Sequence, residues 1–91
     1  MKKTEFVEAL SEKMGITRVM AASMVDAYHE IISDTLAKEE DVTFVGFGTF
    51  SVRHRSARVG RHPRTGEDMQ LKASRTPSFK AGKGFKDAVA L

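Results

Sequence analysis

Residues 53–66 form a segment that cannot be part of a protein core. The segment holds five arginines, no acidic residue and no apolar run long enough to bury itself. Its last four residues read Pro-Arg-Thr-Gly. This pattern favours a tight turn, because proline presets φ at the first turn position and glycine tolerates a positive φ. Extended segments before and after the turn predict a two-stranded ribbon that is positively charged along its length and projects from a small body.

The length of the chain limits what that body can be. The chain has 91 residues and no cysteine, and a chain of this size buries only roughly 60–65% of its unfolded surface. No disulfide or cysteine-ligated zinc can reinforce it, and small domains of this kind commonly gain core by oligomerising. Neither a signal-peptide pattern nor an apolar run of the ~18 residues that cross a membrane is present. We therefore expect a soluble, cytoplasmic protein with no membrane partner.

The net charge of +3 conceals an uneven distribution along the chain. Residues 1–41 hold five Lys or Arg against nine Asp or Glu, a net charge of −4, whereas residues 42–91 hold ten against three, a net charge of +7. A basic half joined to an acidic half indicates a polyanionic partner that only one side of the protein contacts. We expect this partner to be a nucleic acid.

Two helices are predicted before the first strand. Thr4 is expected to cap the first and Gly15 to end it, and its apolar residues recur at three- and four-residue spacing: Phe6, Val7, Leu10 and Met14. Thr17 is expected to cap a second helix that runs to Ala37. Apolar residues cover more than one face of this second helix, which indicates burial on two sides.

We interpret the second helix as a dimer surface, because so short a chain offers little to cover its second face. The helix could instead be central in the chain's own fold. The expected dimer core combines residues of this helix with phenylalanines that follow it: Met24, Tyr28, Ile31, Ile32, Phe44, Phe47, Phe50 and Phe79.

The second half of the chain reads as strands followed by a short helix. A strand over 42–45 leads through a glycine turn into a second strand, which continues into the arginine segment. Residues 69–75 alternate apolar and polar side chains as a returning strand would, and residues 76–79 continue this strand, in which Pro77 indicates an edge position or a bulge. Gly82 and Gly84 end this strand, and residues 85–89 form the closing helix.

Three motifs in this order carry a family resemblance: Val-Gly-Phe-Gly-Thr-Phe at 45–50, Arg-Val-Gly-Arg-His-Pro-Arg-Thr-Gly at 58–66 and Pro-Ser-Phe-Lys-Ala-Gly-Lys at 77–83. With its opening helices and short last helix, the chain resembles the bacterial HU and integration host factor family over essentially its whole length. The lack of tails and the Thr-Pro-Ser-Phe segment look closer to HU, which implies low sequence specificity. Site preference of the integration host factor kind is the alternative.

The resemblance implies an α+β fold and an intertwined homodimer. Each chain would have two N-terminal helices, a three-stranded antiparallel sheet extended into a long β-ribbon arm, and a short C-terminal helix. The single DNA-binding domain, 1–91, would comprise a helical dimerisation part (1–41), a sheet (42–81) with its arm at about 53–75, and the last helix (82–91). The implied function is that of a histone-like nucleoid protein, without a cofactor, that binds duplex DNA in the minor groove, bends and compacts it, and favours bent or nicked duplexes.

The basic residues supply the candidate DNA contacts. Arginine suits the narrow, strongly negative minor groove, because its flat guanidinium is weakly hydrated and forks to phosphates and base acceptors. Lysines near the glycine-opened start of the last helix would share a phosphate with its backbone N–H groups. The candidate DNA-binding residues are Lys3, Arg53, Arg55, Arg58, Arg61, His62, Pro63, Arg64, Lys72, Arg75, Lys80, Lys83 and Lys86.

The tip of the ribbon carries two further expectations. From the residues alone, Pro63 either only shapes the turn or also acts as an apolar wedge, and the resemblance favours a wedge inserted at a base step. His62 stands where the family usually has asparagine. Because both side chains can donate hydrogen bonds, we expect the tip to form with histidine in this position.

Other functions fit the sequence less well. A helix-turn-helix reader needs base-reading groups on one side of its second helix, where this chain has Arg18 among acidic and apolar residues. RNA binding by the basic ribbon stays open, although no aromatic pair for stacking bases is evident. The three histidines show neither metal-binding spacing nor a catalytic partner, so no enzyme and no metal site are expected. A purely structural dimerisation module would leave the charge asymmetry unexplained.

Overall fold

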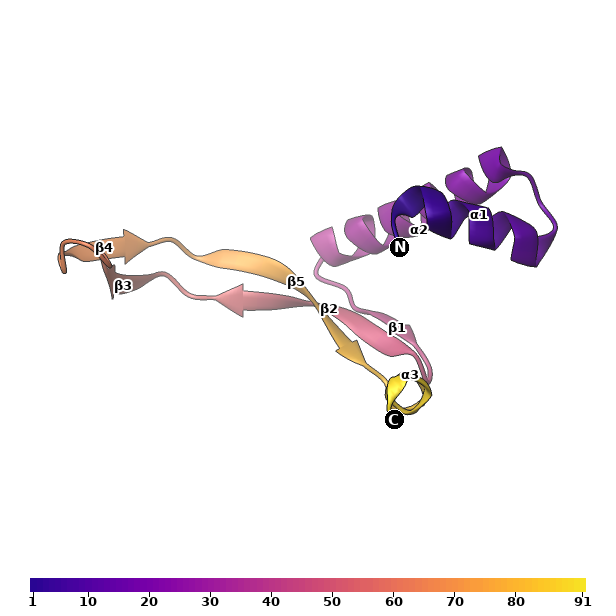
Figure 1. The fold of residues 1–91 in the computed structure, drawn as a ribbon. Coiled ribbons are helices and arrows are strands. Elements are labelled where there is room, and N and C mark those ends of the chain that lie inside the picture. Colours follow the sequence, from indigo (N-terminus) through magenta and orange to yellow (C-terminus); the bar gives the residue numbers. More distant parts are fainter. The chain divides into compact units, whose positions relative to one another are not determined.

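The computed structural model describes residues 1–91 and shows a mixed α+β fold. In chain order the elements are α1 (Lys3–Met14), α2 (Arg18–Ala37), β1 (Val42–Phe44), β2 (Gly48–Arg55), β3 (Arg58–Arg61), β4 (Asp68–Leu71), β5 (Ser74–Ala81) and α3 (Lys83–Val89) (Figure 1). The chain divides into two compact units, residues 1–35 and residues 36–91, and all strands lie in the second. No helix is long and apolar enough to span a membrane.

The first unit is a helical hairpin with a small core. Val7 of α1 packs with Ala21 and Val25 of α2, and Leu10 and Ile16 cover this cluster in part. The spacing of these residues along each helix places them on one stripe, as the sequence pattern predicts.

The helix ends follow local sequence signals at two of three positions. Gly15 adopts the left-handed conformation, with φ 65°, after α1, and the Oγ1 of Thr17 accepts a hydrogen bond from the backbone N–H of Met20 at 3.1 Å. The expected cap at Thr4 is wrong. The helix begins before this residue, and Lys2 takes the cap position without a side-chain hydrogen bond.

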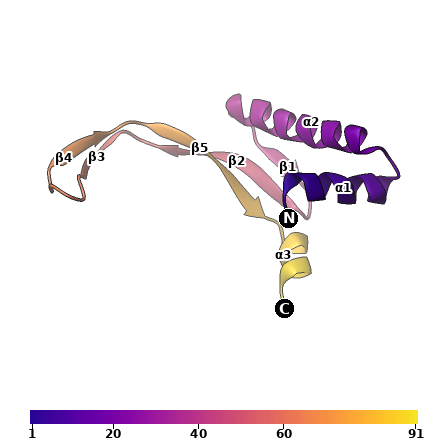
Figure 2. The ribbon, with the colours of Figure 1, turned by 45° about the horizontal axis from the view of Figure 1, so that its top comes forward.

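The second unit is built on an antiparallel sheet in the order β1-β2-β5. Pro77 lies in β5 at the edge of this sheet and pairs one-to-one with Val52, so the predicted edge position is confirmed, without a bulge. β3 and β4 pair as a separate ribbon, and Figure 2 shows them continuing the course of β2 and β5. The predicted arm is therefore present, but residues 56–57 and 72–73 interrupt its strands.

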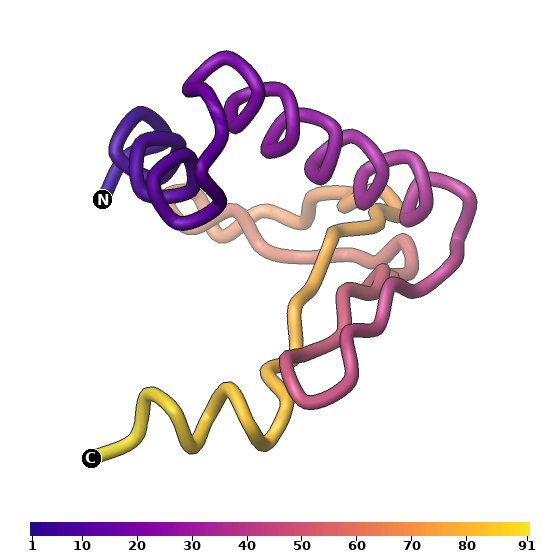
Figure 3. The backbone as a smooth tube through the Cα atoms, turned by 90° about the vertical axis from the view of Figure 1, so that its right-hand side faces the viewer, coloured from indigo at the N-terminus to yellow at the C-terminus, as the bar shows by residue number.

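The start of α3 packs closely against the turn between β1 and β2 (Figure 3). Gly46 takes a φ of 82° in this turn. The N–H of Gly82 donates to the carbonyl of Phe47 at 2.7 Å, and the N–H of Phe85 donates to the carbonyl of Gly46 at 3.0 Å. A Cβ at Gly84 would lie 2.8 Å from the oxygen of Gly46, so only glycine fits this contact.

Phenylalanines hold the sheet and α3 together. Phe47 and Phe85 stack with ring centroids 4.5 Å apart and an interplanar angle of 8°. Phe79 lies beside this pair and also packs on Phe50, with ring centroids 4.7 Å apart. These contacts join the rings of the sheet and of the β1–β2 turn to Phe85 of α3.

Most of the expected dimer core keeps exposed surface within one chain. Ile32 is buried and Phe50 is half-buried. The other six residues expose between 38% and 63% of their surface: Met24, Tyr28, Ile31, Phe44, Phe47 and Phe79. No large side chain anywhere in the chain is fully buried, and a chain with so little core is marginally stable by itself.

Candidate nucleic-acid interface

The pairing of β2 with β5 sorts the basic side chains of the arm onto two faces. Side chains alternate along a strand, and cross-strand partners share a face. One face carries Arg53, Arg55 and Lys80 among serine and threonine residues. The opposite face carries His54 paired with Arg75, in line with the aromatic residues. The arginines of the arm therefore do not form one continuous contact surface, although all were expected to line it.

A basic pocket of about 220 Å³ lies where the strands of the arm are interrupted. Its lining includes the side chains of Arg55, Arg58 and Lys72 together with the hydroxyl residues Ser56 and Ser74. Guanidinium, ammonium and hydroxyl groups are the donors that proteins use to bind phosphate oxygens. The pocket thus gathers predicted contacts from both strands of the arm at one place.

The tip is held by hydrogen bonds around His62. The N–H of Gly66 donates to the carbonyl of His62 at 2.9 Å, and Gly66 has the predicted positive φ, 72°. The Nδ1 of His62 accepts hydrogen bonds from the backbone N–H groups of Arg64 at 3.2 Å and Thr65 at 3.4 Å. Pro63 is exposed at the end of the arm. The tip forms as expected, but the histidine ring acts in it as an acceptor and not as a donor.

Arg75 and His54 are both bound by Glu39, which lies in the turn after α2. The Oε1 of Glu39 accepts a hydrogen bond from the Nη1 of Arg75 at 2.5 Å, and its Oε2 lies 2.8 Å from the Nε2 of His54. The same Nη1 donates to the carbonyl of Ala37 at 3.3 Å. The Arg75 guanidinium, and then His54, hold the pKa of Glu39 below its ordinary value of 4.5.

Three lysines surround the start of α3. Lys80, Lys83 and Lys86 are all exposed, as a contact to DNA requires. The expectation that the backbone N–H groups here also take a phosphate is wrong for Gly82 and Phe85, because the carbonyls of the β1–β2 turn already accept from both.

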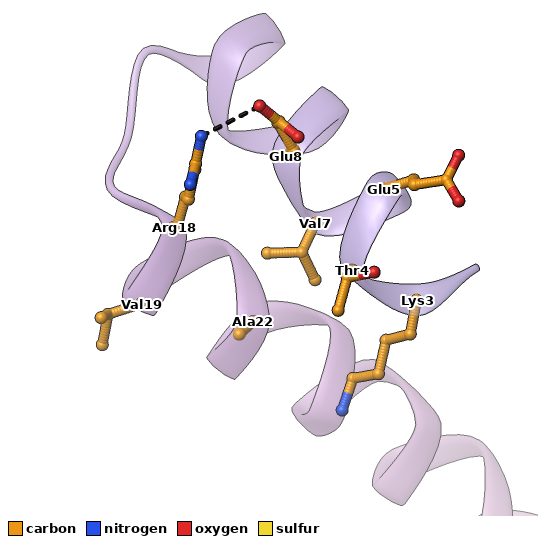
Figure 4. A pocket seen from close by; sticks show the side chains of 8 residues that line it. All are labelled: Lys3, Thr4, Glu5, Val7, Glu8, Arg18, Val19 and Ala22. Atoms are coloured by element: carbon orange, nitrogen blue, oxygen red, sulfur yellow. Dashed lines mark hydrogen bonds and ion pairs between the residues drawn. The ribbon is translucent and has the colours of Figure 1, made fainter. Parts of the chain in front are cut away.

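Lys3 belongs to the helical unit, where its ammonium donates to Asp26 at 2.6 Å. It lines a pocket between α1 and α2 together with Glu8 and Arg18 (Figure 4). Arg18 donates to the carboxylate of Glu8 at 2.9 Å. Arg18 is the only lysine or arginine of α2, and because it is paired with an acid, α2 lacks the free basic side chains of a helix that reads DNA.

Sequence patterns did not indicate that Glu39 and His54 contact each other. Glu39 lies in no motif of the sequence, and His54 reads as one more residue of the basic ribbon. This contact depends on the strand register that places His54 opposite Arg75, and on the turn after α2, which places the Glu39 carboxylate within hydrogen-bond distance of both side chains.

A helical hairpin joined to a sheet with a basic two-stranded arm describes an α+β nucleic-acid-binding module, and comparison with known proteins identifies its class. A family model described as bacterial DNA-binding protein matches residues 1–90. The chain therefore belongs to the family of bacterial DNA-binding proteins that includes HU.

Individual relatives agree with this assignment. The DNA-binding protein HU of Staphylococcus aureus (strain COL) is 49% identical over 98% of this chain and 99% of its own length. HU of Geobacillus stearothermophilus is 47% identical over the same shares. The Anabaena HU–DNA cocrystal structure matches with a TM-score of 0.89 and 43% identity, covering 99% of this chain and 98% of that one. The resemblance drawn from the three motifs is confirmed.

Proposed function

We propose that this chain is a histone-like architectural protein of the bacterial nucleoid that binds duplex DNA with little regard to sequence. The observation that carries the proposal is the basic face of the arm, where Arg53 and Arg55 project side by side and lead to the basic pocket at 55–58 and 72–74. Contacts of this kind to phosphates and to the minor groove carry little sequence information. The names of the relatives favour DNA over RNA and HU over integration host factor.

We assign the contacts along the arm, the tip and the start of α3. The face of the arm that carries Arg53 and Arg55 contacts the DNA backbone together with the basic pocket, while Arg61 and Arg64 flank the tip. Lys80, Lys83 and Lys86 extend the contact beyond the arm, and Lys3 contributes from the helical unit. The assigned residues are Lys3, Arg53, Arg55, Arg58, Arg61, His62, Pro63, Arg64, Lys72, Lys80, Lys83 and Lys86.

The functional form is a homodimer with two arms. Met24, Ile31 and Phe47 keep 45%, 63% and 45% of their surface exposed, and burying them against a second copy would supply the core that one chain lacks. Two arms can hold a duplex between them. The exposed ring of Pro63 would then insert at a base step. Partial unstacking costs on the order of a few kcal/mol per step, offset by the larger protein surface that a bent duplex contacts.

Binding of a labelled duplex at increasing salt tests the contact surface. The logarithm of the binding constant should fall linearly with the logarithm of salt concentration, by about 0.9 for each phosphate neutralised. Arg53→Gln should reduce this slope. Arg18→Gln is the matched control, because Arg18 is an exposed arginine paired with Glu8 outside the arm, and it should leave the slope unchanged. A slope near zero, or binding abolished by Arg18→Gln alone, would contradict the proposal.

The same titrations on other nucleic acids separate the remaining alternatives. A nicked duplex should bind more tightly than the intact duplex of the same sequence, a duplex RNA should bind more weakly, and saturation should require two chains per site. Equal affinity for nicked and intact DNA would remove the role of deformability. Equal affinity for RNA would favour the RNA-binding hypothesis.

A further inference from the structure

Glu39 has a backbone conformation that glutamate rarely adopts. Its φ is 64°, and it is the only residue other than glycine with a positive φ. Its N–H donates to the carbonyl of Leu36 at 2.9 Å, directly after α2. Glycine normally occupies this left-handed position after a helix, because a Cβ is crowded there. Residues persist in such conformations where interactions with the surrounding structure hold them.

The side chain of Glu39 supplies those interactions, and they bridge the two strands of the arm. One carboxylate oxygen contacts His54 in β2 and the other contacts Arg75 in β5. His54 and Arg75 are direct cross-strand partners near the outer end of this pairing. Because Arg75 also donates to the carbonyl of Ala37, both strands of the arm are connected to the turn that ends α2.

The position of the bridge separates it from the proposed DNA contacts. Arg75 and His54 share the face opposite to Arg53 and Arg55. A DNA phosphate that contacts Arg53 and Arg55 lies on one side of the sheet, whereas the side chain of Arg75 lies on the other side. The Nη1 of Arg75, moreover, already donates to the carboxylate of Glu39 and to the carbonyl of Ala37.

We infer that Glu39 is a positioning residue that anchors the root of the arm, residues 53–55 and 74–76, through His54 and Arg75. Arg75 then fixes the arm and does not contact DNA. The part of this inference that concerns DNA rests on the proposed function. The anchoring itself is a property of the protein alone and can be measured without DNA.

Hydrogen exchange of the free protein tests the anchor. Glu39→Gln removes the charge, and exchange of the backbone amides at 53–55 and 74–76 should become about two- to fivefold faster, the range expected for exposed ion pairs. Glu40→Gln is the matched control, because it removes the same charge from the adjacent residue, which makes no ion pair. Equal exchange in the wild type, the Glu39 variant and the control would overturn the inference.

Glu39→Gly separates anchoring from general stability. Glycine relieves the left-handed backbone, so the thermal midpoint should stay equal or rise while exchange at the arm root still becomes faster. If the residue had only a local structural role, exchange at the arm root would not become faster while the thermal midpoint stayed equal or rose. Retention of full protection at the arm root in the glycine variant would show that the carboxylate is not an anchor.

The sign of the pH dependence follows from the pKa of Glu39. The titratable and charged groups that face its carboxylate are Arg75 from β5 and His54 from β2, with Lys38 and Glu40 as chain neighbours, and Arg75 is the main cause of the lowered pKa. The anchor should therefore be fully present above the ordinary value of 4.5 and disappear as pH falls through the lowered pKa. The exchange difference between wild type and Glu39→Gln should vanish in that range; a difference that persisted below it would contradict the anchor.

DNA binding tests the role assigned to Arg75. Arg75→Gln should leave the salt dependence of DNA affinity unchanged, whereas Arg53→Gln should lower its slope by about 0.9 for each phosphate that is no longer neutralised. In the exchange measurement, the double variant with Glu39→Gln should show less than the sum of the two single effects, because both substitutions remove the contact between Glu39 and Arg75. A lower slope in Arg75→Gln would overturn the role assigned to Arg75. If the wild type fails to bind duplex DNA, the proposed function fails while the exchange result stands.

Discussion

His62 determines the local structure of the arm tip through one ring nitrogen. Its Nδ1 accepts from the N–H groups of Arg64 and Thr65, and this closes the backbone around Pro63. The Oδ1 of asparagine, like the Nδ1 of histidine, is bonded to Cγ, so it can accept the same two hydrogen bonds. Histidine can therefore replace the asparagine of the family pattern, because the tip needs an acceptor there.

His62→Ala should loosen the tip, and His62→Asn should preserve it. Exchange of the Arg64 and Thr65 amides should become several-fold faster in the alanine variant, since both N–H groups lose their acceptor. The alanine variant should also discriminate less between nicked and intact duplex, because Pro63 is held less firmly. If the asparagine variant exchanges as fast as the alanine variant, the acceptor role is refuted.

Single-residue signals were readable from sequence wherever one local rule decided the outcome. The positive φ of Gly66 and the cap at Thr17 follow from turn and capping chemistry alone, and both are present. The cap at Thr4 failed because the helix starts before it. The role of Glu39 was not readable, because it depends on contacts with residues 15 and 36 positions further along the chain.

At the scale of elements, α3 is fixed by the fit of its glycines against the β1–β2 turn. The carbonyls of Gly46 and Phe47 accept from the start of the helix, and the aromatic stack of Phe47 on Phe85 covers the contact. The glycine-phenylalanine motif that first indicated a tight turn therefore also forms the docking surface for the last helix.

Gly84→Ala should destabilise the protein by about 1–3 kcal/mol, the usual cost of overpacking a closed contact. The added Cβ would lie 2.8 Å from the backbone oxygen of Gly46, which cannot move without disturbing the turn. Gly60→Ala is the control, because its Cβ would meet only the Leu71 side chain, at 3.0 Å. Urea unfolding measures both variants. Equal midpoints for the two would show that this close contact is unimportant.

The elements themselves were largely predictable, but their pairing was not. Periodicity and turn residues placed both long helices, the glycine turn and the returning strand close to their observed bounds. The two faces of the arm follow from which residue of β2 lies opposite which residue of β5. Shifting that register by one residue would exchange the faces, and the local pattern of the arginine segment does not specify it.

At the scale of the whole molecule, charge follows the division of the chain. Residues 1–35 hold four Lys or Arg against six Asp or Glu, a net charge of −2, and residues 36–91 hold eleven against six, a net charge of +5. The basic unit carries the arm, and the acidic unit carries exposed apolar residues such as Ile31. This distribution fits the proposed dimer, in which most of the proposed DNA contacts lie in residues 36–91 and exposed residues of the helical unit, such as Met24 and Ile31, supply part of the surface to be buried.

The most direct test of the account is the bend that the protein imposes on a duplex labelled at both ends for energy transfer. The wild type should bring the ends closer together. Pro63→Ala should bind with nearly the same salt dependence, because the basic side chains are intact, yet bend the duplex less, because the apolar wedge is removed. An unchanged end-to-end distance in Pro63→Ala at saturation would contradict the wedge, and a duplex that stays straight with the wild type would contradict the architectural function.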